Sequence, residues 1–231
     1  MGSTAIASRA DGAQAREKLL YTALRLFAAK GFERTSTREI AQAAGVNVSA
    51  IGYYFGDKAG LYRAAFMEPL GDLCPGKQNA DFEGVALLPA LQRFFAEFLE
   101  PLKRGEAVRL VMRLHFREMV EPTGLWAEEI ENEIKPGHFA MLQLLARELA
   151  LDAPTAHADL DLQRLCFAIV AMAVHYFVAQ EIVNGIAPRI LADAPAVDTL
   201  AERLAGYAVA MIDAERVRRT EAAADGTRSA A

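Results

Sequence analysis

The sequence predicts an all-α protein with a small N-terminal three-helix domain and a larger helical domain, about nine helices in all. Apolar residues recur three and four positions apart along most of the chain, which is the repeat of an amphipathic helix. No segment shows the strict alternation of apolar and polar residues that is typical of a half-buried strand. The length of 231 residues exceeds the usual single domain, so we expect either one large domain or two unequal domains.

The composition is that of a soluble globular protein, with 53% hydrophobic and 24% charged residues. Arg, Glu and Gln interrupt the apolar stretches, so we expect no membrane-spanning segment. Residues 1–15 lack the basic and apolar regions of a signal peptide, and Cys74 and Cys166 show no disulfide or metal-ligand spacing. These features predict a cytoplasmic protein with free thiols.

The net charge of −5 is unevenly distributed along the chain. Residues 1–66 contain nine Lys and Arg residues against five acidic residues, a net charge of +4, so the remaining residues carry −9. A basic end on an acidic body fits a polyanionic partner that is bound at one end only.

The two ends of the chain differ from its helical middle. Residues 1–14 and 220–231 are rich in small and polar residues, and we expect both segments to be disordered. The first helix between them is predicted to end at Gly31, because glycine tolerates the conformation that follows a helix C-terminus. The buried face of this helix consists of residues spaced three and four apart: Leu20, Ala23, Leu24 and Phe27.

A capping box marks the start of a second, short helix. The Ser36 hydroxyl and the Glu39 carboxylate can each satisfy a free backbone amide there. Ile40, Ala41 and Ala44 are expected to face inward, and Gly45 ends the helix after about two turns.

A third short helix follows the turn at Gly45. Asn47 can cap it, and we expect it to run from Val48 to about Tyr54. Its inward residues, Ile51 and Phe55, lie four apart. Two short helices joined by a glycine-containing turn form a helix-turn-helix, the unit that places its second helix in the DNA major groove. The face of the third helix opposite its inward residues carries Ser49, Gly52 and Tyr53.

The remainder of the chain is also predicted to be helical. Asp57 caps a fourth helix that ends near Gly71, and residues 72–83 form a linker that contains Pro and Gly. The apolar stretch 165–178 has almost no polar side, as in a helix buried by both its own domain and a partner. The further helical stretches are residues 86–103, 107–120, 125–150 with an interruption at Pro136 and Gly137, 160–184 and 197–219.

Residues 16–66 resemble the TetR family of bacterial regulators. Three runs carry the resemblance: AREKLLYTALRLFAAKGF, TSTREIAQAAGV and IGYYFGDK. It implies a DNA-binding domain over residues 15–56 and a ligand-binding and dimerisation domain over residues 57–219. The stretch from His115 to Pro136 is similar to the CecR (YbiH) branch, some members of which respond to antibiotics. Gly52 departs from the family pattern, because most relatives have Tyr or Asn there, so a side-chain contact to DNA is absent at this position.

Carried over by position, the resemblance implies eight DNA contacts. Hydroxyl, guanidinium and backbone amide groups at the start of the second helix would bind phosphates, as would two tyrosines and a lysine further along. The start of the third helix would meet base edges, partly through apolar contact with thymine methyl groups. Because few of these groups are bidentate, we expect DNA shape to contribute to specificity. The eight residues are Thr37, Arg38, Val48, Ser49, Ala50, Tyr53, Tyr54 and Lys58.

A small-molecule pocket is expected among the middle helices, because such pockets combine an apolar lining with a few polar groups. For each Met or aromatic residue there, core packing remains the leading alternative. His115, His175 and Tyr176 lie in apolar stretches, so we expect them to be buried and to need a partner that a ligand could supply. The expected pocket residues are Met112, His115, Phe116, Met119, Trp126, Phe139, His175 and Tyr176.

Other classes of function stay open. A metal site could combine His115, Glu118, His138 and His175, since positions three apart share a helix face. An all-helical enzyme is a second alternative, although the sequence contains no paired Glu-x-x-His motif, glycine-rich phosphate loop or Gly-x-Ser-x-Gly turn. A protein-binding adaptor is disfavoured by the basic N-terminal end. We expect no catalytic residue, no metal and no cofactor.

The sequence therefore predicts a ligand-responsive transcription regulator, most simply a repressor released from a palindromic DNA operator when a small molecule binds. The ligand would favour a conformation in which the helix after Asp57 has moved the two DNA-binding domains out of groove spacing. We expect a homodimer through Leu160–Asn184 and Val197–Arg219, whose apolar faces exceed what one domain needs to cover itself. Packing within one domain is the alternative.

Overall fold

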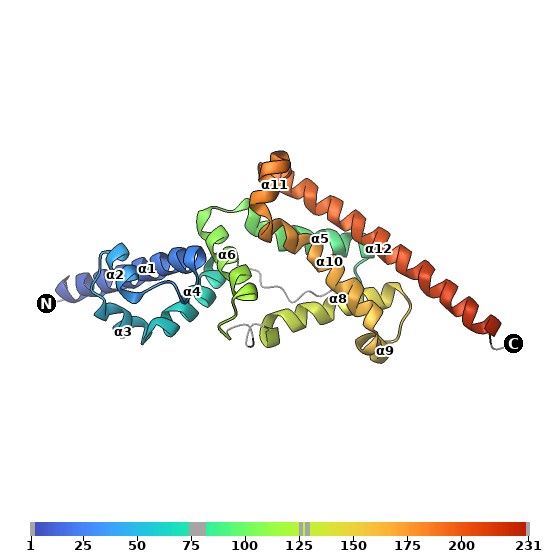
Figure 1. The fold of residues 1–231 in the computed structure, drawn as a ribbon, viewed down its shortest axis with the longest axis horizontal. Helices are drawn as coiled ribbons and strands as arrows, with labels where there is room; N and C mark the ends of the chain where they lie inside the picture. The colour runs from blue at the N-terminus through green and yellow to red at the C-terminus, as the bar shows by residue number, and fades with distance from the viewer. Residues whose placement is uncertain (1–2, 74–81, 125–126, 128–129, 230–231) are drawn as a thin grey trace. The chain divides into compact units, whose positions relative to one another are not determined.

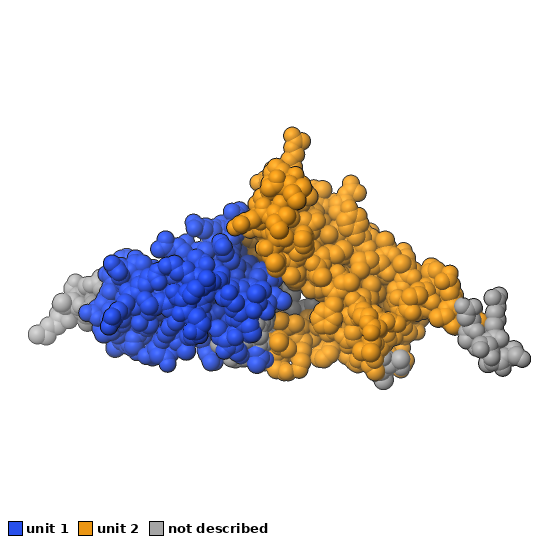
Figure 2. Space-filling view, viewed as in Figure 1, with its two compact units in different colours: residues 1–77, 104–128 blue, residues 78–103, 129–231 orange. Residues whose placement is uncertain are grey.

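A computed structural model describes residues 3–73, 82–124, 127 and 130–229 of the chain. Within these ranges the chain forms eleven α-helices and no strand, so the predicted all-α class is confirmed (Figure 1). The helices group into two compact units (Figure 2). The first unit is Met1–Lys77 with Arg104–Glu128, and the second is Gln78–Lys103 with Glu129–Ala231.

The first unit contains helices α1 (Ser3–Lys30), α2 (Thr37–Ala44), α3 (Ser49–Phe55), α4 (Lys58–Leu73) and α6 (Glu106–Val120). Helix α1 contacts each of the other four, and α4 also contacts α3 and α6. The predicted burial is confirmed for Ala23, Leu24 and Phe27, whereas Leu20 is only half-buried and its neighbour Leu19 is fully buried. Residues from all five helices form one core, including Leu24, Phe27, Ile40, Ile51, Leu61, Phe66, Val111 and Leu114.

The predicted caps position the two short helices. The Ser36 hydroxyl accepts a hydrogen bond from the Glu39 amide at 3.1 Å, and Gly45 ends α2 in the left-handed region, at φ +69°. One half of the capping box differs from the prediction. The Glu39 carboxylate binds Lys30 at the end of α1, and this hydrogen bond lowers the pKa of Glu39. Helix α2 is therefore attached to α1 as well as capped.

The start of α4 lies directly against the end of α3. The Asp57 carboxylate accepts a hydrogen bond from the Gly60 amide at 2.8 Å, so the predicted cap is confirmed. A Cβ atom at Gly60 would stand 2.0 Å from the Phe55 carbonyl oxygen, which no side chain could tolerate. Glycine at this position is what lets the backbone of α4 approach α3 so closely.

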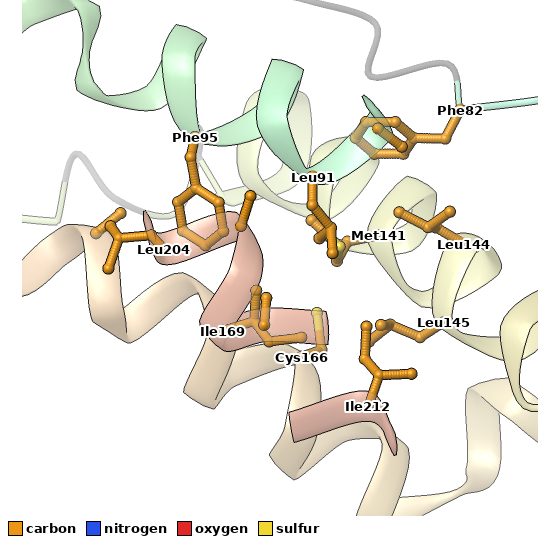
Figure 3. Packing of buried hydrophobic residues seen from close by; sticks show 14 of the residues in the cluster. Phe82, Leu91, Phe95, Met141, Leu144, Leu145, Cys166, Ile169, Leu204 and Ile212 are labelled. Carbon is orange, nitrogen blue, oxygen red and sulfur yellow. The ribbon is translucent and has the colours of Figure 1, made fainter. Parts of the chain in front are cut away.

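The second unit is a helical bundle around its own core. Its helices are α5 (Leu87–Leu99), α8 (Lys135–Glu148), α9 (Ala153–Ala158), α10 (Leu160–Val178), α11 (Gln180–Ile186) and α12 (Ala194–Ser229). Shorter helical turns cover Glu100–Lys103, Ile130–Ile134 and Pro188–Leu191. Side chains from α5, α8, α10 and α12 meet in the core, among them Leu91, Phe95, Met141, Leu145, Ile169 and Leu204 (Figure 3).

An ion pair joins the two longest helices of the second unit. The Asp159 carboxylate caps α10 by accepting hydrogen bonds from the amides of Asp161 and Leu162. The same carboxylate accepts two hydrogen bonds from Arg219 of α12, at 2.7 and 3.1 Å. These donors, Arg219 first, lower the pKa of Asp159 to about 2. The start of α10 is thereby fixed to α12.

Several helix boundaries differ from the sequence-based expectations. Helix α1 begins at Ser3 and α12 ends at Ser229, so the two segments expected to be disordered are largely helical. Both segments are rich in alanine, the strongest helix former, which outweighs their lack of apolar side chains to bury. The expected interruption at Pro136 is the start of α8, where proline is tolerated in the first turn.

The division into units also differs from the expected boundary at residue 57. Helices α4 and α6 belong to the first unit, because Val111 and Leu114 of α6 are fully buried in its core. The sequence did not predict that α6 belongs to the first unit, because residues 78–103 of the second unit lie between α4 and α6 along the chain. The chain thus leaves the first unit and returns to it.

Candidate nucleic-acid interface

Helix α3 turns one face into the core and the other into solvent, as predicted. Ile51 is only 2% exposed, whereas Tyr53 is 83% and Val48 45% exposed. Ser49 and Gly52 are exposed on the same outward face as Tyr53. This face has the residue types that could contact another molecule, and the protein covers none of the four residues.

The start of α3 is organised by one side chain. The Asn47 carboxamide oxygen accepts hydrogen bonds from the Ser49 amide at 2.9 Å and from the Ser49 hydroxyl at 2.8 Å. The predicted capping role of Asn47 is confirmed, although the helix itself begins at Ser49 rather than Val48. Because the Ser49 hydroxyl donates its proton to Asn47, it presents acceptor lone pairs to a partner.

The two tyrosines of α3 have different environments. Their rings pack edge to face, with centroids 4.9 Å apart. Tyr53 projects into solvent, whereas Tyr54 is half-buried against the core of the first unit. The N-terminal part of α1 also passes close to Tyr54, because a Cβ atom at Gly12 would stand 3.3 Å from its hydroxyl oxygen. Tyr54 therefore links α1 to α3 while its neighbour stays exposed.

The predicted phosphate-binding residues flank this face. Arg38 is exposed and Thr37 half-buried in the first turn of α2, where backbone amides and the helix dipole attract anions. The Lys58 ammonium lies 4.2 Å from the centroid of the Phe32 ring, which holds the charge at the start of α4. Ala50 is half-buried and packs against the core, so less of it is available to a partner than of Val48.

A second arginine braces α3 from the side. Arg16 of α1 donates two hydrogen bonds to the Glu68 carboxylate of α4, at 2.6 and 3.0 Å. Its guanidinium carbon also lies 4.9 Å from the centre of the Phe55 ring, at the end of α3. One side chain thus connects α1, α3 and α4.

A buried carboxylate ties α6 to α4 in the first unit. Glu118 of α6 is fully buried and accepts a hydrogen bond from the Tyr62 hydroxyl of α4 at 2.7 Å. Its second oxygen accepts from the amide and the hydroxyl of Thr123, at 2.6 and 2.8 Å. Burial and the hydrogen bond to Glu118 raise the pKa of Tyr62, so the phenol remains a donor. Three donors satisfy a charge that would be costly to bury alone.

The sequence contains a signal for this buried network. Val111, Leu114, His115 and Glu118 are spaced three and four apart, so the carboxylate falls on the apolar stripe of α6. An acidic residue at such a position predicts a buried polar partner. The partners themselves, Tyr62 and Thr123, could not be identified without the fold.

The expected pocket residues are divided between the two units. His115 is 6% exposed, stacks on Phe66 with ring centroids 3.8 Å apart, and has Nδ1 2.9 Å from the Val111 carbonyl oxygen. Met112 and Phe116 of α6 are half-buried, and Met119 is 55% exposed. Trp126 lies outside the described residues. His115 therefore has the predicted burial but packs in the core of the first unit.

The pocket residues of the second unit fit the expectation less well. His175 was expected to be buried, but within the single chain it lies on the exposed side of α10, next to the ring of Tyr176. Tyr176 is half-buried against the core, and burial raises its pKa. Phe139 is 42% exposed and its ring meets that of His157, with centroids 5.1 Å apart. The apolar periodicity of α10 did not reveal which of its sides faces inward.

The residues of the alternative metal site are also separated. His115 and Glu118 belong to the first unit, whereas His138 and His175 belong to the second. Among the described residues, no group of three or more His, Cys, Asp or Glu side chains is arranged to hold a metal ion. His138 instead bridges α8 and α10, with Nε2 2.6 Å from the Gln163 oxygen and Nδ1 3.3 Å from the Cys166 sulfur. Burial raises the pKa of the Cys166 thiol to about 12, which makes it a structural donor.

Comparison with known proteins connects this architecture to a class of protein. Residues 19–65 match the bacterial regulatory proteins of the tetR family, and residues 89–214 match the C-terminal domain of the HTH-type transcriptional dual regulator CecR. The chain is similar to CecR of Shigella flexneri, with 30% identity over 180 residues that span 69% of this chain and 76% of that protein. It is also 30% identical over 173 residues to the HTH-type transcriptional regulator RutR of Escherichia coli strain K12, spanning 73% of this chain and 76% of that protein.

The fold agrees with a solved relative. The crystal structure of an alanine-substituted HlyIIR mutant protein has a TM-score of 0.56 at 18% identity, covering 84% of this chain and 94% of that one. Fold, outward-facing helix and sequence matches define a DNA-binding transcription regulator, not an enzyme. The chain belongs to the TetR family and has a C-terminal domain of the CecR type. Both resemblances predicted from the sequence are confirmed.

The buried network makes a prediction about stability. Tyr62→Phe removes one of three donors to the buried Glu118 carboxylate, and we expect the free energy of unfolding to fall by about 1–3 kcal/mol. Urea denaturation of the full chain measures it. Tyr53→Phe is the matched control, because the same atom is removed from a side chain that is 83% exposed. Equal stability of the two variants would contradict the assigned role of Glu118.

Proposed function

We propose that this regulator is a homodimeric repressor that leaves a palindromic operator when a small molecule binds its C-terminal domain. The observation that carries the DNA-binding part is the outward face of α3, which exposes Val48, Ser49 and Tyr53 on a helix fixed by the core. In a helix-turn-helix this is the helix that enters the major groove. CecR carries the description of a dual regulator, and repression is the simpler hypothesis for this chain.

In the proposed complex, contacts divide into two kinds. Thr37, Arg38 and Lys58 would bind phosphates and set the position of the protein on the duplex. Val48 and Ser49 would face base edges, with apolar contact to a thymine methyl group and a hydroxyl oxygen as acceptor. Tyr53, whose ring is held by Tyr54, would reach a phosphate through its hydroxyl. Ala50 and Tyr54 would contribute less, since the core already covers part of each.

Lys58 provides the test of DNA binding. We expect Lys58→Ala to weaken binding to a duplex selected from a random pool by the full-length protein. We also expect it to reduce the slope of log affinity against log salt by about 1, because one phosphate contact is lost. Gel retardation at several salt concentrations measures both. Lys135→Ala, which removes an exposed lysine of the second unit, should change neither. An unchanged slope for Lys58→Ala would remove that residue from the interface.

The proposed dimer interface is an apolar stripe on α10 and α12. On α10, Phe167 and Val178 are each 63% exposed, and on α12 Tyr207 and Val217 are each 57% exposed. Ala168, Ala171 and Ala210 are exposed small residues between them, and the exposed Gly206 lies next to Tyr207. Small residues at these positions would let helices approach closely. Large exposed apolar side chains at helical spacing mark surfaces that a partner covers. Two helices from each subunit would then form a four-helix interface.

Helix α10 also has the length and composition of a membrane-spanning helix, although a partner-covered helix passes the same test. Among the described helices, α10 is the one with this length and composition, and only 22% of its apolar segment is buried within the chain. The matching DNA-binding domain favours the subunit interface as the explanation for its exposed apolar side. We therefore propose a cytoplasmic dimer, in which the partner subunit covers this side.

A charge placed on the stripe tests the dimer. We expect Ala171→Glu to convert the protein to a monomer in sedimentation velocity experiments, because two buried carboxylates would face each other across the twofold axis. Operator affinity should fall at the same time, since the half-sites would be bound separately. Gln143→Glu adds the same charge at an exposed position of α8 and should leave the dimer intact. A dimeric Ala171→Glu protein would place the interface elsewhere.

The connectivity of α6 suggests how a ligand could act on DNA binding. Both ends of α6 continue along the chain into the second unit, while its apolar side is buried in the core of the first. Glu118 attaches this helix to α4 through Tyr62. We propose that a ligand bound by the C-terminal domain shifts α6, and that α6 moves α4 and thereby the spacing of the two α3 helices.

Reciprocity makes this coupling measurable. Any compound that raises the melting temperature of the protein by binding the C-terminal domain should lower operator affinity, and the operator should lower affinity for the compound by the same factor. Titration calorimetry and gel retardation measure the two factors. In Tyr62→Phe we expect the compound to bind normally but the factor to shrink, because α6 is less firmly attached to α4. A compound that binds without changing operator affinity would contradict the proposal.

A further inference from the structure

Gly52 occupies the centre of the outward face of α3. It lies between Ser49, three residues earlier, and Tyr53, and both neighbours on this face are exposed. Val48, which lies one turn earlier, is 45% exposed. The row of side chains that faces solvent is therefore interrupted at the middle of the helix.

The protein itself gives no reason for glycine at this position. Its φ angle is not positive, so an L-residue could adopt the same backbone. Apart from atoms of its chain neighbours and the helix backbone, nothing lies within 4 Å of where a Cβ atom would stand. Glycine destabilises a helix relative to alanine, and α3 has only seven residues. Gly60 differs, because the Phe55 carbonyl group requires glycine there.

The place of Gly52 on the outward face of α3 points instead to the molecule that this helix binds. Gly52 adds no side-chain donor or acceptor, and its carbonyl oxygen already accepts a hydrogen bond from the Gly56 amide at 3.1 Å. The interruption is thus an apolar gap, bordered by the Val48 side chain. The apolar group on base edges in the major groove is the 5-methyl group of thymine. A side chain at Gly52 would occupy the space such a group needs when the helix lies close to the bases.

We propose that Gly52 is a specificity-determining residue that admits a thymine methyl group between the side chains of α3. This rests on the proposed DNA-binding function. The residue acts by shape, because the gap selects a base by the volume it accommodates. The stability that alanine would add to α3 is given up for this close approach.

The test combines a protein substitution with a base substitution. The probe is a duplex selected from a random pool by the full-length wild-type protein, with each thymine in turn replaced by deoxyuridine, which lacks the methyl group. We expect Gly52→Ala to melt at the same or a higher temperature than the wild type and to bind the selected duplex at least about tenfold more weakly. Deoxyuridine at one symmetry-related pair of positions should restore most of that loss. At the same pair it should weaken wild-type binding.

Gly137→Ala is the matched control, since α8 also has open space around this glycine and lies in the second unit. It should leave DNA binding unchanged. Gly52→Ser, with a larger side chain, should lose more affinity than Gly52→Ala. Equal binding by wild type and Gly52→Ala would overturn the proposal, as would a loss that deoxyuridine restores at no position. Failure of the wild-type protein to select any duplex would instead overturn the proposed DNA-binding function.

Discussion

The structure of the first unit depends on the burial of two helices that could not exist alone. Helices α2 and α3 have eight and seven residues, and isolated helices of fewer than about twelve residues are marginal in water. Their stability comes from Ile40, Ala41 and Ile51, which are at most 3% exposed against α1 and α4. Because Ile51 supplies the apolar burial of α3, the outward side chains of this helix are not needed for packing and are available to a partner.

The same dependence explains why so many polar contacts surround α3. Asn47 organises its start, Arg16 packs over its last residue, and Gly60 lets α4 approach its end. Each contact restricts the direction of the helix rather than adding apolar burial. A helix that reads base edges must be held in a fixed direction, since hydrogen bonds and methyl contacts tolerate little displacement.

Glu118 imposes a different kind of constraint on the first unit. A fully buried carboxylate is tolerated only while its donors remain in place, and one of these donors, Tyr62, belongs to α4, so it holds α6 against that helix. A small continuous slide of α6 along α4 would break the Tyr62 hydrogen bond and leave one buried oxygen of Glu118 without its donor. Motion between discrete arrangements is therefore favoured over gradual deformation, which is the behaviour that a ligand-driven switch needs.

Local signals in the sequence were enough to predict the helix-turn-helix, because Ser36, Gly45 and Asn47 specify their caps within a few residues. Contacts between distant segments were not predictable in this way. The packing of α6 joins Glu118 to Tyr62 of α4, 56 positions away, and Arg117 to Ala29 of α1, 88 positions away. Neither the composition nor the periodicity of α6 identifies these partners. The exposed position of His175 was missed for a related reason, since α10 is apolar on both sides and one of them is uncovered.

A single α3 helix can make only a few strong contacts with base edges. No residue on its outward face can make a bidentate hydrogen bond to a base, and a single copy would bind DNA mainly through phosphates. Specificity under the proposed function must therefore come from fit at positions such as Gly52 and from two copies held at the spacing of the half-sites. Because each DNA-binding domain alone would bind weakly, operator affinity would depend on the spacing of the two domains. A ligand would therefore not need to disrupt the contacts between α3 and DNA. Changing the distance between two intact α3 helices is enough to release the operator.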